Sequence, residues 1–235
     1  MPVLFRHLPD GILAYGWFGG MHSRFDIALV SGTACKALVP LIVERCETMV
    51  RNIEALASRF LPDSALVCHY NNGSAMPPEL IEIIDRCNGI AWRTAGYFDT
   101  AVHGDIPDLC GFLKGYAAER IKELLLSEGY TDALINAGNS SITAIGSAPG
   151  CDDWSIGTPA GNIALHNEAL SISGLHTDGS AHILNPLTGQ YSTGTPVVVS
   201  GPEADVAEIL STALFAAPPP ERPAILANFP EYTML

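Results

Sequence analysis

The stretch at residues 108–120, DLCGFLKGYAAER, begins as a glycine-containing loop and continues as a predicted helix. Its two glycines allow a tight backbone path and the close approach of a ligand. Lys114 falls in the first helical turn, where free amides and a partial positive charge favour a phosphate. The spacing is that of neither a Walker A loop nor a dinucleotide-binding fingerprint, so ordinary helix packing is the alternative. We therefore predict a phosphate-binding loop, and motifs elsewhere in the chain have to decide between this prediction and ordinary helix packing.

The composition is that of a globular protein. The chain has 235 residues, 48% hydrophobic and 16% charged, which suffices for a large core. Helices and strands interleave without a regular βαβ rhythm, which indicates an α+β fold. We expect a helix-rich first part and a strand-rich second part that form a two-lobed mixed-sheet structure. The prediction is a single domain over residues 1–235, with possible lobes at 1–105 and 106–235.

Charge and targeting signals restrict the partners. The net charge of -13 repels nucleic acid and anionic membranes, so we expect no nucleic-acid partner. A phosphate-bearing ligand would need local cations. No apolar run is long enough to span a bilayer, and the N-terminus lacks a signal-peptide pattern. Six cysteines without a Cys-X-X-Cys pair favour a reducing compartment. We expect a cytoplasmic location, or a periplasmic one if a leader has been removed.

Apolar spacing and turn residues predict the remaining elements. The helices are expected at 40–59, 78–87 and 202–215, and a further helix begins within 108–120 and stops at Gly129. The second of these helices should turn Leu80, Ile81, Ile84 and Cys87 inward. The strands are expected at 25–30, 65–68, 131–137, 142–146, 153–157, 163–166, 169–173 and 197–200.

The last predicted helix carries a set of hard oxygen donors. One helical turn separates Glu208 from Ser211 and Thr212, so the three side chains can share a face. A carboxylate with hydroxyl groups suits Mg²⁺, which also accepts carbonyl and phosphate oxygens. The alternative is a half-exposed helix with ordinary polar residues.

Two further residues could carry chemistry. His182 precedes an Asn-Pro turn, where a histidine can serve as general acid or base or as a structural residue. Cys110 could be a nucleophile with His182 and Asp108 as partners. A thiol that packs as a small hydrophobe is the alternative for Cys110.

Seven short motifs occur in one order along the chain, and together they resemble the ApbE-type flavin transferases (FAD:protein FMN transferases). The resemblance covers about residues 21–216. The motifs are MHS (21–23), SRFLPDS (58–64), TAGYFDT (94–100), DLCGFLKGYAAE (108–119), SISG (171–174), HILNPLTG (182–189) and AEILSTAL (207–214).

The resemblance implies roles for the matching positions. FAD would lie between the two parts of the chain, and Mg²⁺ would be bound by the Gly111 carbonyl and by Glu208 and Thr212, with Ser211 as a further ligand. His182 would take the proton of the acceptor hydroxyl. The positions that would contact FAD are Met21, Phe60, Tyr97, Phe98, Asp99, Asp108, Lys114 and Ile183.

The family transfers FMN from FAD to a threonine or serine hydroxyl of a target protein and releases AMP. Some members hydrolyse FAD to FMN and AMP instead. This sequence departs from the family pattern at Glu208, which replaces an aspartate, at Cys110 and Ser140, which replace a glycine and an aspartate, and in a shortened segment between Val102 and Asp108. The alternatives are therefore an FAD hydrolase, a flavin-binding protein without turnover and a cysteine hydrolase.

Overall fold

The computed structural model describes residues 2–32 and 35–235. Its centre is one eight-stranded sheet in the order β1-β2-β3-β4-β5-β8-β11-β12, in which every neighbouring pair is antiparallel. The strands are β1 Val3–Leu8, β2 Gly11–Gly20, β3 Ser23–Ser31, β4 Ala133–Ala137, β5 Ser141–Ile145, β8 Ala169–Ser173, β11 Val197–Gly201 and β12 Thr233–Met234.

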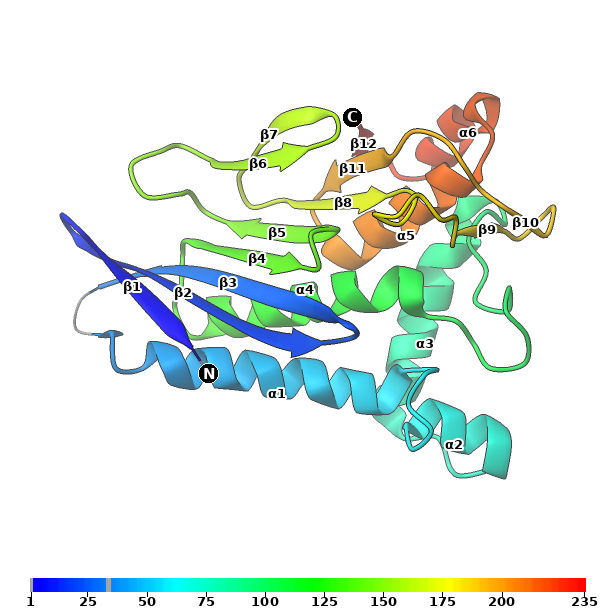
Figure 1. The fold of residues 1–235 in the computed structure, drawn as a ribbon, viewed down its shortest axis with the longest axis horizontal. Coiled ribbons are helices and arrows are strands. Elements are labelled where there is room, and N and C mark those ends of the chain that lie inside the picture. The colour runs from blue at the N-terminus through cyan, green and yellow to red at the C-terminus, as the bar shows by residue number, and fades with distance from the viewer. Residues whose placement is uncertain (1, 33–34) are drawn as a thin grey trace.

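Helices cover one face of the sheet, and a hairpin covers part of the other (Figure 1). The helices are α1 Val39–Ala57, α2 Ala65–Asn72, α3 Pro78–Ala91, α4 Cys110–Ser127, α5 Ala204–Ala216 and α6 Arg222–Leu226. The hairpin consists of β6 Trp154–Thr158 and β7 Gly161–Leu165, and a second small pair consists of β9 Leu184–Asn185 and β10 Gln190–Tyr191.

The core follows from strand alternation. Phe25, Ile27 and Leu29 of β3 are fully buried on the helix-covered face, because successive side chains of a strand point to opposite faces. On the other face, Trp154 and Leu165 of the hairpin pack with strand residues in a smaller cluster. The sheet therefore has a thick core on one side and a partly open surface on the other.

The predicted α+β class is confirmed. Helices and strands occur in both parts of the chain, since β1, β2 and β3 belong to the first part and α4, α5 and α6 to the second. The predicted helices and all predicted strands except 65–68 are present, with boundaries shifted by a few residues. Strand β3 of the first part pairs directly with β4 of the second, so the sheet continues across the boundary between the expected lobes. On this continuity, we propose that residues 1–235 form a single domain.

Some local predictions are wrong. Residues 65–68 are the first turn of helix α2 and not a strand. The Ser64 hydroxyl caps that helix by accepting the Val67 amide at 3.1 Å, and this cap outweighs the β propensity of a short apolar run. Ile81 is 43% exposed although it was expected to face inward. Strands β1 and β2 were not expected; in β2, aromatic residues and glycines are mixed without a clear alternation.

Helices α4 and α5 pack backbone to backbone at Gly115. A Cβ placed on Gly115 would lie 2.4 Å from the Ala204 carbonyl oxygen, so only glycine allows this distance. One turn further along α4, the Glu119 carboxylate accepts the Ala204 amide at 3.0 Å and satisfies a free donor at the start of α5. Helix α4 thereby fixes the position of the first turn of α5.

We predict that Gly115→Ala destabilises the protein by about 1–3 kcal/mol, because the added methyl group meets rigid backbone. Gly89 is the matched control: it lies in α3 with no atom within 4 Å of an added Cβ. Gly89→Ala should stabilise the protein by about 0.5–1 kcal/mol. Urea unfolding of the two variants measures both effects. Equal unfolding free energies would contradict the close packing of α4 on α5.

Candidate functional site

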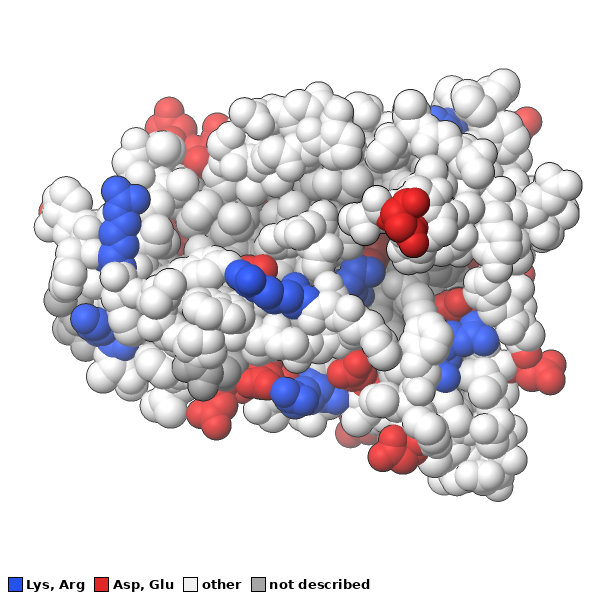
Figure 2. Space-filling view, in the orientation of Figure 1, with Lys and Arg blue, Asp and Glu red and all other residues white. Residues whose placement is uncertain are grey.

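A cavity of about 670 Å³ lies where the β2–β3 turn, the end of α1 and the first turns of α4 meet. Cationic and titratable nitrogen groups line it together with Asp108 and Glu54. The nitrogen-bearing side chains are His22, Arg59, His103, Lys114, His176 and His182. Figure 2 shows acidic and basic side chains interspersed over one face of the molecule. The cavity therefore offers the local cations that an anionic ligand needs in a protein of net charge -13.

The first turn of α4 departs from a regular helix at Gly111, whose φ and ψ are -81° and 19°. A Cβ at this position would lie 2.8 Å from the Phe98 ring and 3.2 Å from the Thr212 hydroxyl oxygen. The Asp108 carboxylate accepts the Cys110 amide at 2.9 Å and so satisfies one free donor at the start of the same turn. Gly111 therefore brings the backbone of α4 next to the hydroxyl of α5.

Glu208 connects the two helices through its buried carboxylate, and the residue is 4% exposed. One oxygen lies 2.8 Å from the Lys114 Nζ. The other accepts the amide of Gly115, which in a regular helix would donate to the Gly111 carbonyl. Attraction by Glu208 outweighs the effect of burial and raises the pKa of the Lys114 ammonium group. Lys114 therefore remains charged at neutral pH.

The hydroxyl groups of α5 have different surroundings. Thr212 donates to the Glu208 carbonyl at 2.9 Å and lies 3.2 Å from the Ser173 hydroxyl. Ser211 is fully buried, and its hydroxyl lies 3.0 Å from Ser171 and 2.8 Å from Ser173. Ser211 thus forms part of a hydroxyl cluster with β8, whereas Thr212 lies beside Gly111.

An ion-pair network holds the other wall of the cavity. Arg59 Nη1 lies 3.2 Å from Asp108 Oδ2, and Arg59 Nη2 donates to the His103 carbonyl at 3.2 Å. His103 Nε2 lies 3.5 Å from the same Asp108 oxygen. The loop after α1, which carries Arg59, is therefore joined to the loop before α4, which carries His103 and Asp108.

His182 stacks on His176 with ring centroids 3.8 Å apart and an interplanar angle of 24°. Partial burial lowers the pKa of His182, and the nearby His176 and Lys114 lower it further. A neutral imidazole can accept a proton, so His182 has the protonation state of a general base at neutral pH.

Cys110 is in the opposite state. Although Cys110 is exposed, desolvation by its neighbours and the Asp108 carboxylate raise the pKa of its thiol well above the ordinary value. A protonated thiol is a poor nucleophile, so this pKa shift does not favour the cysteine-hydrolase alternative.

The structure brings some predicted residues to the cavity and keeps others away. Met21, Phe60, Asp108, Lys114 and His182 line it. The remaining predicted FAD contacts have other surroundings: Phe98 is buried, Tyr97 and Ile183 pack against the core, and Asp99 accepts the Ala101 amide at 2.9 Å.

Among the cavity-wall residues that the sequence did not predict, five carry a charged or titratable side chain: His22, Glu54, Arg59, His103 and His176. His22 and Arg59 stand inside recognised motifs, but nothing in the spacing reveals that their side chains face a cavity. The other three come from a helix and two loops that only the fold brings together.

The oxygen donors fit a hard cation. Glu208, Thr212 and the Gly111 carbonyl lie together where α4 meets α5, and carboxylate, hydroxyl and carbonyl oxygens are ligands that Mg²⁺ accepts. Within residues 2–32 and 35–235, no group of three or more His, Cys, Asp or Glu side chains is arranged to bind a metal. Any cation here would therefore depend on the single carboxylate of Glu208 with backbone, hydroxyl and ligand oxygens.

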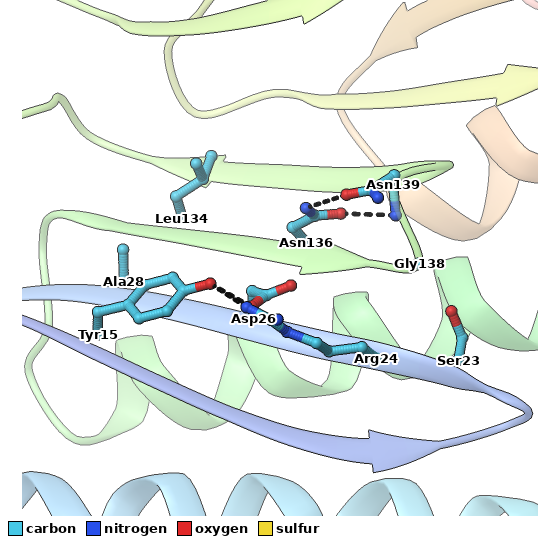
Figure 3. Close-up of a pocket in the computed structure, with 9 residues that line it drawn as sticks. All are labelled: Tyr15, Ser23, Arg24, Asp26, Ala28, Leu134, Asn136, Gly138 and Asn139. Carbon is cyan, nitrogen blue, oxygen red and sulfur yellow. Dashed lines mark hydrogen bonds and ion pairs between the residues drawn. The ribbon is translucent and has the colours of Figure 1, made fainter. Parts of the chain in front are cut away.

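A second cavity of about 410 Å³ lies on the open face of β2, β3 and β4. Figure 3 shows that its polar groups bond mainly with one another. Tyr15 donates to Asp26, and Asn136 donates to Asn139 at 2.8 Å. Because these groups satisfy one another, the first cavity is the better candidate site.

Comparison with protein families decides the assignment. The sequence model of the ApbE family matches residues 107–235, from the loop before α4 to the last residue. The chain belongs to the ApbE family. A search among curated protein sequences finds no match.

Solved structures share the fold of this ApbE-family chain. The apo flavinyl transferase ApbE of Pseudomonas stutzeri has a TM-score of 0.84 at 16% identity, covering 98% of this chain and 97% of that one. The flavin transferase ApbE of Vibrio cholerae has a TM-score of 0.80 at 16% identity, with 94% and 93% covered. The ApbE protein of Thermotoga maritima has a TM-score of 0.78 at 21% identity, with 94% of each chain covered.

One finding concerns membranes. Across the described residues, none of the helices combines the length and apolar character that crossing a bilayer requires.

The ion pair between Lys114 and Glu208 can be tested by a double-mutant cycle. We predict that Lys114→Met lowers the free energy of unfolding by about 1–3 kcal/mol, because it leaves the buried carboxylate without its cation. The double variant Lys114→Met/Glu208→Gln should recover part of this loss. Thermal and urea unfolding measure both. Strictly additive effects of the two substitutions would contradict a direct interaction.

Proposed function

We propose that this protein transfers FMN from FAD to a threonine or serine hydroxyl of a target protein, with release of AMP and dependence on Mg²⁺. The observation that carries the proposal is the convergence on one cavity of a charged lysine, a helix start and a neutral histidine, beside a set of hard oxygen donors. Membership of the ApbE family supports it, as do the names of two similar structures, which are called flavin transferases.

Substrate binding would use the chain's own cations. The diphosphate of FAD would lie against Lys114 and the first turn of α4, where an ammonium group and a helix start favour negative charge. Met21 and Phe60 offer apolar surface to a ring of the substrate, and Phe60 is 60% exposed for contact.

The proposed metal ligands are Glu208, Thr212 and the Gly111 carbonyl, with Ser211 supporting Thr212 through the Ser173 hydroxyl. Bound there, Mg²⁺ would neutralise negative charge on the diphosphate. Glu208 would exchange its contact with Lys114 for the cation, which frees the ammonium group for the phosphate oxygens.

His182 would act as the general base. It takes the proton of the acceptor hydroxyl, whose oxygen attacks the phosphorus of the FMN phosphate. The bond to the AMP phosphate breaks, and AMP leaves with the electron pair. The protein supplies position and charge rather than a covalent intermediate. With water in place of the hydroxyl, the same geometry would hydrolyse FAD to FMN and AMP.

FAD cleavage tests the proposal directly. We expect Mg²⁺-dependent release of AMP from FAD, measured by chromatography, and a loss of about 100-fold or more in Glu208→Ala. Glu208→Asp keeps the carboxylate and is the matched control, so it should retain activity well above that of Glu208→Ala. FAD binding without AMP release, even with cell extract added as a source of acceptor proteins, would favour the non-catalytic alternative.

The pH dependence tests the role of His182. Its lowered pKa means that the base stays neutral below the ordinary value of 6.5, so kcat/KM should fall only as pH drops through that lowered pKa. His176→Gln removes one cause of the lowering and should move the acidic limb to higher pH. A profile identical in both proteins would contradict the coupling of the two rings.

A further inference from the structure

The β2–β3 turn of the cavity wall has an unusual backbone for its residues. Gly20 pairs with Ser23, which leaves a two-residue turn made by Met21 and His22. Their φ angles are 51° and 54°, so both residues lie in the left-handed region. A turn of this kind favours Asn and Gly, because bulky side chains in that region meet the neighbouring backbone.

At the other left-handed positions of the described residues the chain uses Gly, Asn or, at Ala95, a small side chain. The turn between β4 and β5 uses Gly138 and Asn139 at φ of 68° and 58°. The start of β8 is preceded by Asn167 at φ 54°. Among residues 2–32 and 35–235, two bulky residues at consecutive left-handed positions therefore occur only in the turn that faces the cavity.

Specific contacts hold the Met21-His22 turn in place. The Met21 amide donates to the Glu54 carboxylate of α1 at 3.0 Å. The His22 ring stands edge-on to the Phe60 ring, with centroids 5.6 Å apart and an interplanar angle of 84°. All four residues line the cavity. His22 is exposed, so burial of its ring in the folded protein does not offset the unfavourable backbone.

We propose that His22 is a substrate-contacting residue that, with Phe60, forms a corner receiving a planar heteroaromatic ring. Two rings set nearly at right angles offer a face and an edge, which are the geometries in which aromatic groups associate. The inference rests on the proposed function, because FAD supplies two such rings, isoalloxazine and adenine. The unfavourable backbone of Met21 and His22 would then serve substrate binding and not the stability of the fold.

The test separates binding from stability. His22→Gly and His22→Asn suit the left-handed backbone, so their thermal midpoints should be unchanged or higher by about 2–4 °C. Their affinity for FAD, measured by flavin fluorescence in EDTA to prevent turnover, should weaken about 3- to 10-fold. His22→Phe keeps a ring and should bind FAD within about 3-fold of the unmodified protein. A lower midpoint in His22→Gly, or unchanged FAD affinity, would overturn the proposal.

FMN and AMP, titrated separately, identify the ring. A loss of affinity for FMN alone assigns the corner to isoalloxazine, and a loss for AMP alone assigns it to adenine. If the unmodified protein binds none of FAD, FMN and AMP, the proposed function fails and this inference with it. Binding that is insensitive to residue 22 removes only the inference.

Discussion

The buried carboxylate of Glu208 is the interaction on which the site depends. It joins α5 to α4 through the Gly115 amide and the Lys114 ammonium group. The backbone contact at Gly115 and the capping of α5 by Glu119 hold the helices in the register that this bridge requires. In the proposed function, stability and activity would therefore use the same few atoms, because a charge buried at a helix contact needs a partner whether or not a ligand is present.

The same bridge shapes the first turn of α4, which we propose as the binding loop. Diverting the Gly115 amide to Glu208 goes together with the irregular backbone at Gly111, which lies beside Thr212. In the proposed function, Glu208 would hold a cation, and Lys114 would be released to contact the diphosphate. The longer side chain of glutamate, compared with the aspartate of the family pattern, suits a carboxylate that has to reach an amide and an ammonium group at once.

Much of the fold could be predicted from the sequence, because periodic apolar residues and glycine or proline boundaries mark α1, α4, α5 and most strands. The capping of α2 by Ser64 could not be predicted, since it depends on the competition between a helix cap and the β propensity of a short apolar run. The exposure of Ile81 could not be predicted either, since it depends on which elements pack against α3. At the site, Lys114, Glu208 and His182 stand in motifs from which a chemical role could be predicted. His22, Arg59 and His176 lack such a signal, because their roles arise from a backbone conformation and from contacts between distant segments.

The central claim is that Glu208 exchanges Lys114 for a cation when substrate binds. Anomalous diffraction from crystals grown with FAD and Mn²⁺, as a substitute for Mg²⁺, locates the ion directly. The account predicts an ion bonded to oxygens of Glu208 and Thr212, with Lys114 turned to the diphosphate. An intact Lys114–Glu208 pair, with FAD bound and the ion absent or elsewhere, would contradict it.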